Sequence, residues 1–174
     1  MSFPMASDIA PASGLPLGAD FEVPSRRGFI ALLGAFRATG GTAPGGIVGR
    51  LLEEHRVGNA VSLAKLIYTG QVFGFEWRAS LWIPMFQFDA DDLALKEGVQ
   101  RVRAELPSQW SGWTLAAWFA EPNAWLEGRS PVDVLDSDLQ AVMRAARLLE
   151  SVDEFSLPLP PPPPQRVHEV AAHV

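Results

Sequence analysis

The sequence contains no cysteine, a single tyrosine and three histidines among 174 residues. The absence of cysteine excludes disulfide bonds, thiolate metal sites and cysteine nucleophiles. No apolar run approaches the roughly 20 residues that a membrane-spanning helix needs. The first 19 residues also lack the basic start and unbroken apolar stretch of a signal peptide. We therefore expect a cytoplasmic protein that does not enter a membrane.

Basic residues are also scarce, with 14 Lys and Arg against 20 Asp and Glu, which gives a net charge of −6. Residues 1–104 are neutral, so the whole excess of acid lies in residues 105–174. Phosphate contacts need a basic surface, which disfavours nucleic-acid binding by the C-terminal part. The acidic residues there suit either solubility or a basic partner surface.

Residues that could perform catalysis are few. His55 lies on an expected helix without a second ligand one turn later, and the remaining histidines, His168 and His173, lie near the C-terminus. The acid pairs Asp91–Asp92 and Asp136/Asp138 stand where we expect helices to start, so we interpret them as helix caps. The sequence thus predicts no enzyme, no metal and no cofactor.

The two ends of the chain are rich in proline and follow no apolar period. We expect a disordered arm over residues 1–24 and a disordered tail over residues 153–174. The tail contains five consecutive prolines, Pro160–Pro164, which must adopt polyproline II.

An N-terminal module is predicted over residues 25–106. Apolar spacing indicates a helix over about 26–38 capped by Ser25, a second helix after Pro44, and a short third one that begins at Ser62 and ends at Gly70. Aromatic and β-branched residues then alternate around Arg78, which predicts a hairpin of two strands with Pro84 on an edge. A helix over about 97–106 closes the module, with Val99, Val102 and Leu106 on one face.

A helical C-terminal module is predicted over residues 107–152. One helix carries Trp113 and Trp118 and stops at Pro122. Ser130, Pro131 and Asp133 then start a new helix, with serine as the cap and the acid reaching back to free amides. A final helix over about 138–150 would be capped by Asp136 or Ser137. The fold class is therefore mainly α, with two small helical modules, the first winged-helix-like.

Trp125 stands in the turn between two helices of the C-terminal module, where no regular face would bury it. It is either an interface residue or packed onto its own turn. Trp118 falls on a helix position that faces a core, and Trp77 and Trp82 fall on the expected strands, so we expect these three to pack.

The stretch Asn-Ala-Trp-Leu-Glu-Gly-Arg-Ser-Pro-Val-Asp-Val-Leu, residues 123–135, resembles the toxin-binding domain of the Xre/MbcA/ParS antitoxin family. That family's pattern runs roughly Asn-Pro-Ala-Leu-Gly-Gly-Arg-Thr-Pro-Leu-Asp-Leu-Leu. The positions that match it are Asn123, Leu126, Gly128, Arg129, Pro131, Asp133 and Leu135. The likeness is clearest over residues 110–150.

This resemblance implies a non-enzymatic antitoxin that binds a partner toxin, typically a RES-domain protein that consumes NAD, and blocks it by steric occlusion. The residues expected to bind the partner are Asn123, Trp125, Leu126, Gly128, Arg129 and Pro131. The proline-rich tail would be either a passive extension or a plug for the partner's active-site cleft. We also expect that the chain can form a homo-oligomer.

Residues 60–88 resemble the recognition helix and wing of MerR-like and excisionase-type DNA-binding domains. In such a fold the DNA contacts would come from Ser62, Lys65, Tyr68 and Arg78, and the DNA would be the protein's own promoter. Two alternatives to the antitoxin hypothesis follow. One is a DNA-binding transcriptional regulator without a toxin, and the other is a scaffold or adaptor that offers its proline run to an aromatic groove.

Overall fold

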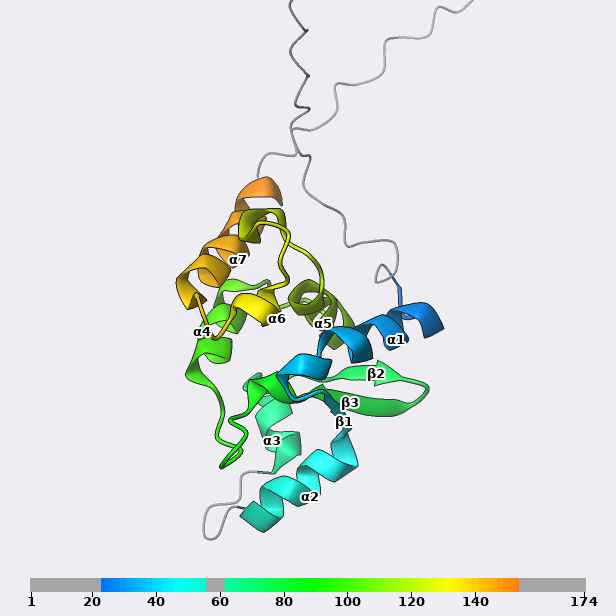
Figure 1. Cartoon of the computed structure of the whole chain (residues 1–174). Coiled ribbons are helices and arrows are strands. Elements are labelled where there is room, and N and C mark those ends of the chain that lie inside the picture. The colour runs from blue at the N-terminus through cyan, green and yellow to red at the C-terminus, as the bar shows by residue number, and fades with distance from the viewer. Residues whose placement is uncertain (1–22, 56–61, 154–174) are drawn as a thin grey trace, which may run out of the picture.

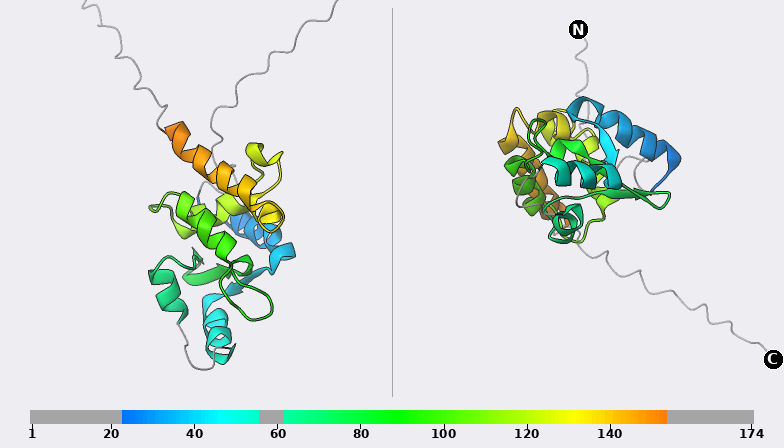
Figure 2. Two further views of the ribbon diagram at one scale, coloured as in Figure 1. Left: turned by 90° about the vertical axis from the view of Figure 1, so that its left-hand side faces the viewer. Right: turned by 90° about the horizontal axis from the view of Figure 1, so that it is seen from below.

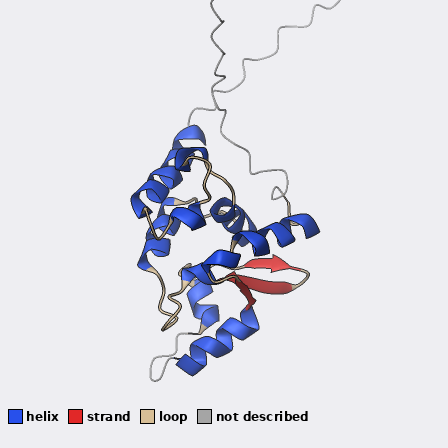
Figure 3. Cartoon of the chain, viewed as in Figure 1, coloured by secondary structure: helices blue, strands red, loops and turns tan. Residues whose placement is uncertain are grey.

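The computed structural model describes residues 23–55 and 62–153, which form a mainly helical molecule with one small sheet (Figures 1 and 3). The predicted arm lies outside the described residues except for Val23 and Pro24, and so does the predicted tail except for Asp153, which ends α7. The helices are α1 (Arg26–Ala35), α2 (Gly45–His55), α3 (Leu63–Tyr68), α4 (Glu97–Glu105), α5 (Gly112–Ala120), α6 (Pro131–Val134) and α7 (Leu139–Asp153). Single 3-10 turns form η1 (Arg37–Thr39), η2 (Met85–Gln87) and η3 (Ala124–Leu126).

The sheet has three antiparallel strands, β1 (Thr42–Pro44), β2 (Phe75–Trp77) and β3 (Ser80–Pro84), in the order β1-β3-β2. The predicted hairpin of β2 and β3 is confirmed. The sequence did not predict β1, because three residues after a glycine pair are too short to show an alternating pattern.

The expectation that Pro84 lies on a sheet edge is wrong, since β3 is the central strand. Pro84 is tolerated because it is the last residue of β3, opposite Thr42, where the ladder ends. The next amide, of Met85, donates to the carbonyl of Gly41 at 2.9 Å and continues the pairing.

The two faces of the sheet bury different helices (Figures 1 and 2). Successive side chains of a strand point to opposite faces. Trp82 therefore packs with α1, while Leu81 and Ile83 pack with α2 and α3. We call the second set the smaller core; its buried members are Val48, Leu52, Leu63, Leu66, Val72, Ile83 and Phe88.

The larger core joins α1, β2, α4, α5, η3, α6 and α7. Its fully buried side chains include Leu32, Phe36, Phe75, Val102, Phe119, Leu126, Val134 and Val142. Leu32 and Phe36 come from the predicted N-terminal module, whereas the residues from Trp113 onward come from the C-terminal one. One hydrophobic core therefore draws on both predicted modules.

Helix α5 approaches the sheet very closely at its first residue, Gly112. A Cβ atom on Gly112 would lie 1.8 Å from the carbonyl oxygen of Gly74, which is closer than any two such atoms can come. Gly74 is equally confined, since a Cβ there would lie 2.5 Å from the side chain of Ile83. These two glycines let the backbones of α5 and of the chain entering β2 touch.

The helix starts confirm several predictions. The hydroxyl of Ser25 accepts from the Gly28 amide at 3.0 Å, and that of Ser62 accepts from the Lys65 amide at 3.3 Å. Gly70 follows α3 with φ of +70°, as expected of a helix-ending glycine.

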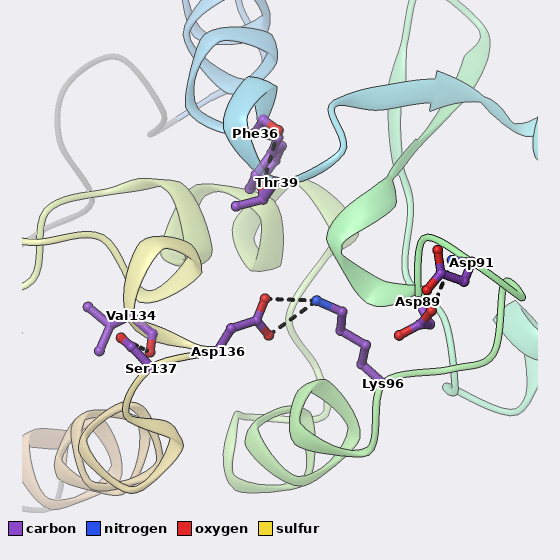
Figure 4. Close-up of polar contacts among 8 residues, drawn as sticks. All are labelled: Phe36, Thr39, Asp89, Asp91, Lys96, Val134, Asp136 and Ser137. Atoms are coloured by element: carbon purple, nitrogen blue, oxygen red, sulfur yellow. Dashed lines mark hydrogen bonds and ion pairs between the residues drawn. The ribbon is translucent and has the colours of Figure 1, made fainter.

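Of the residues expected to cap α7, Asp138 forms the cap, while Asp136 and Ser137 do not. Asp138 accepts from the Ala141 amide at 2.9 Å, one residue before the helix begins at Leu139. Asp136 instead forms an ion pair with Lys96 at 2.8 Å, and the hydroxyl of Ser137 donates to the carbonyl of Val134 (Figure 4). The Lys96–Asp136 pair ties the start of α4 to the turn between α6 and α7.

Of the helices in residues 23–55 and 62–153, none has the length and apolarity that a membrane span requires.

Candidate protein-binding site

The turn between α5 and α6, residues 121–130, is held by a set of hydrogen bonds centred on Asn123. The Asn123 amide donates to the carbonyl of Arg129 at 3.0 Å, and its own carbonyl accepts from the amides of Leu126 and Gly128 at 3.0 and 2.9 Å. Its side-chain oxygen accepts from the Trp125 amide at 2.9 Å. The backbone of this turn, which we call the corner, is therefore fixed at both ends and in the middle.

The corner reverses direction through two left-handed residues. Glu127 has φ of +58° and Gly128 has φ of +77°. Glycine adopts this conformation without strain, which accounts for Gly128, whereas the glutamate pays a small conformational penalty. Gly128 thus acts on the backbone of the corner and has no side chain to offer a partner.

Leu126 and Pro131 lie in the interior. Leu126 is 2% exposed within the larger core, and η3 packs against α7. Pro131 is buried at the first position of α6. These two residues fix the position of the corner on the helices, so their expected part in partner binding is indirect.

Trp125 and Arg129 are the expected binding residues whose side chains reach the surface. Trp125 is 45% exposed, although its neighbour in the same turn is buried. Arg129 and Glu127 are exposed on either side of Gly128. The structure thus places one large aromatic, one cation and one anion on a turn with a fixed backbone.

The start of α6 differs in one detail from the predicted capping pattern. Ser130 occupies the cap position and Pro131 follows it, as expected. The Ser130 hydroxyl makes no cap hydrogen bond to a helix amide, however, and donates to Oδ2 of Asp133 at 2.6 Å. Because the hydroxyl is engaged by the carboxylate, this pair locks the entry into α6 through its side chains.

The residues expected to contact DNA do not share one surface. Ser62 and Lys65 are exposed on α3, where Tyr68 is 92% exposed. Helix α3 packs in the smaller core, on one face of the sheet. Arg78 lies in the hairpin turn, 5.7 Å above the ring of Trp77, on the face that carries the larger core.

A contact that the sequence did not predict joins α1 to the hairpin. Phe29 stacks on Trp77 with ring centroids 5.2 Å apart, and it meets Trp82 edge-on at 5.1 Å. Arg26 precedes Phe29 by one helical turn, on the same side of α1. The alternating aromatics of residues 73–77 were the signal for this contact, but nothing in the sequence identified Phe29 as their partner.

The groups considered for catalysis remain dispersed. His55 is exposed at the end of α2, with Nδ1 3.0 Å from the Leu51 carbonyl. Asp91 and Asp92 do not cap a helix, which corrects that prediction, because α4 begins only at Glu97. The loop is shaped by Asp89 and Asp92, which accept from nearby amides (Figure 4 shows the first of these bonds). Within the described residues, no group of three or more His, Asp or Glu is placed to hold a metal ion.

In comparisons with protein-family models, curated proteins and solved structures, this chain has no match.

Proposed function

We propose that this protein is an antitoxin-like, non-enzymatic cytoplasmic protein whose corner binds a partner toxin and occludes it. The observation that carries the proposal is Trp125, which is 45% exposed on a turn whose backbone is held by Asn123 and anchored by buried Leu126. The likeness of residues 123–135 to the toxin-binding domain of the Xre/MbcA/ParS family supports the same assignment.

The physical argument rests on preorganisation. Tryptophan and arginine are the residues that most often dominate binding energy, and they do so best where little conformational freedom is lost on docking. The corner meets both conditions, because the amides of Trp125 and Arg129 themselves, and those of Asn123, Leu126 and Gly128, are already hydrogen-bonded before a partner arrives. A partner surface with an apolar pocket for the Trp125 indole and a carboxylate near Arg129 would complement it.

The partner implied by the family resemblance is a RES-domain toxin that consumes NAD. A protein that binds over the mouth of such an enzyme inhibits it without chemistry of its own, so the chain needs no cofactor. The proline-rich tail, residues 157–164, is a second candidate for occlusion, and it lies outside the described residues.

The test is to co-express the chain with the product of the adjacent reading frame and to follow growth, cellular NAD and co-purification. Trp125→Ala and Arg129→Ala should each weaken the complex by about 1–3 kcal/mol and restore NAD loss. Tyr68→Ala is the matched control, because Tyr68 is an even more exposed aromatic on α3, in a different part of the molecule. Full neutralisation by Trp125→Ala, or a partner that never co-purifies, contradicts the proposal.

A second candidate function is DNA-binding regulation of the protein's own promoter. The observation that favours it is the passage from α3 directly into the β2–β3 hairpin, as in a helix followed by a wing. Salt-sensitive retardation of the upstream DNA by the full-length chain is the test, and no retardation at low salt contradicts it.

A further inference from the structure

We infer that duplex DNA contacts this protein at the edge formed by the hairpin turn and the start of α1, through Arg26 and Arg78, and not through α3. The inference rests on the regulator candidate and assigns its binding surface. We call this surface the arginine edge; it comprises Arg26, Phe29, Trp77 and Arg78.

The arginine edge is assembled from segments far apart in the sequence. Phe29 and Trp77 stack at 5.2 Å with their rings nearly parallel, at 12°. Arg78 lies above the Trp77 ring, and Arg26 lies one turn before Phe29 on α1. Figure 1 and the right-hand view of Figure 2 both show the first turn of α1 beside the hairpin turn. Two exposed arginines therefore lie on the same edge as one pair of stacked rings.

Basic residues outnumber acidic ones in α1 and the hairpin, as far as the structure describes them. Helix α1 contains no acid, and within the hairpin, residues 75–84, Glu76 is the single acidic residue. Glu76 neighbours Trp77 along β2, and because strand side chains alternate it points to the other face of the sheet. Arg27, also exposed, adds a further cation to the start of α1.

The hairpin turn holds Arg78 in a backbone conformation that arginine rarely adopts. Arg78 and Ala79 have φ of +50° and +58°, the mirror-image turn that normally carries Asn-Gly. Any residue other than glycine or asparagine is strained at such a position. An arginine held at a strained turn fits a surface that binds phosphate.

The face of α3 is a poorer match for a polyanion. Lys65 is its one basic residue, and α2, which packs against α3, exposes Glu53 and Glu54. Phosphate contacts contribute through released counterions, so a single cation beside two acids contributes less than two cations whose one acidic neighbour in the hairpin, Glu76, lies on the other face of the sheet.

The experiment uses the full-length chain and a fluorescent duplex of the DNA upstream of its own reading frame, with affinity measured by anisotropy from low to moderate salt. Arg26→Ala and Arg78→Asn should each weaken binding about 3–10-fold and reduce the salt slope by about one. Lys65→Ala and Arg50→Ala, which remove cations from α3 and α2, are matched controls and should change affinity less than about twofold.

Arg78→Asn separates binding from folding. Asparagine suits the left-handed turn better than arginine, so the variant should melt at the same or a higher temperature while it binds DNA more weakly. The inference is overturned if Arg78→Asn leaves the affinity for DNA unchanged, or if Lys65→Ala weakens binding as much as Arg78→Asn does. It is also overturned if polyglutamate competes for the protein as well as unlabelled duplex DNA does, or if no binding is seen at low salt. Neutralisation of the partner toxin should be unaffected by Arg78→Asn, so failure here is distinguishable from failure of the antitoxin proposal.

Discussion

The side-chain amide of Gln87 pairs with the backbone of Phe73 as a neighbouring strand would. Its Oε1 accepts from the Phe73 amide at 2.9 Å, and its Nε2 donates to the Phe73 carbonyl at 2.8 Å and to the Pro84 carbonyl at 3.0 Å. Gln87 is 1% exposed, so these bonds form away from water. One side chain thus supplies the hydrogen bonds that a neighbouring strand would make, because the short sheet does not reach this segment.

Gln87→Leu should lower the free energy of unfolding by about 3 kcal/mol. The leucine fills a similar volume but leaves the buried amide and carbonyl of Phe73 without partners. Urea unfolding measures the change. Gln140→Leu, at an exposed position of α7, is the control and should change stability by less than about 0.5 kcal/mol. Equal effects of the two substitutions would show that the Gln87 bonds add no stability.

Gly112→Ala should destabilise the protein by about 3 kcal/mol or more, because the new methyl group overlaps the Gly74 carbonyl and must push α5 off the sheet. Gly49→Ala, in the middle of α2 with no atom near the added carbon, should instead stabilise by about 1 kcal/mol. Thermal melts of the two variants should therefore shift in opposite directions. A Gly112→Ala protein as stable as the parent would refute the close approach.

Leu126→Ala and Trp125→Ala should behave differently although the two residues are adjacent. Leu126 is buried in the larger core, so its truncation should cost about 2–5 kcal/mol. Trp125 is half exposed, so its truncation should cost about 1 kcal/mol or less in the absence of a partner. Denaturant midpoints check both values, and a large loss for Trp125→Ala would make that residue part of the fold.

The ion pair between Glu105 and Arg147 should make stability depend on acid pH. The hydrogen bond from Arg147 lowers the pKa of Glu105 below its ordinary value. A lowered carboxyl pKa stabilises the fold above the ordinary value, about 4.3, and the benefit is lost as the pH falls through the folded value. The melting temperature should thus exceed that of Glu105→Gln at pH 7, and the two should converge near pH 3.

The control for this pH effect is Arg144→Gln, which removes an exposed arginine from the same helix without touching Glu105. It should leave the difference between pH 7 and pH 3 unchanged, whereas Arg147→Gln should reduce it as Glu105→Gln does. If Arg144→Gln and Arg147→Gln change the difference between pH 7 and pH 3 equally, general charge repulsion and not the ion pair explains the pH dependence.

The helices and the hairpin could be predicted from the sequence because each depends on residues close in the chain. Val99 and Val102, for example, share a helix face by spacing alone, and both are buried in the larger core. Strand β1 was missed because its pairing is set by β3, about 40 residues away. The cap of α7 could be narrowed only to Asp136, Ser137 or Asp138, because the three are chemically similar candidates, and the cap falls on Asp138 since the helix begins at Leu139.

The candidate site shows the same limit. Spacing predicted the corner, but a turn has no periodic face, so the exposure of Trp125 and the burial of Leu126 could not be separated in the sequence. The stacking of Phe29 on Trp77 depends on how α1 crosses the sheet, which local patterns do not encode. That contact brings Arg26 of α1 and Arg78 of the hairpin turn to the same edge of the molecule.

The larger core also has a consequence for biosynthesis. Leu32 and Phe36 leave the ribosome before most of their core, which includes Val142 and Ala146 near the end of the described chain. At about 5–20 residues per second, the roughly 110 residues between Phe36 and Ala146 need on the order of ten seconds to synthesise. During that interval the apolar face of α1 has no complete core to enter, so we expect the nascent chain to expose this face until α7 is synthesised.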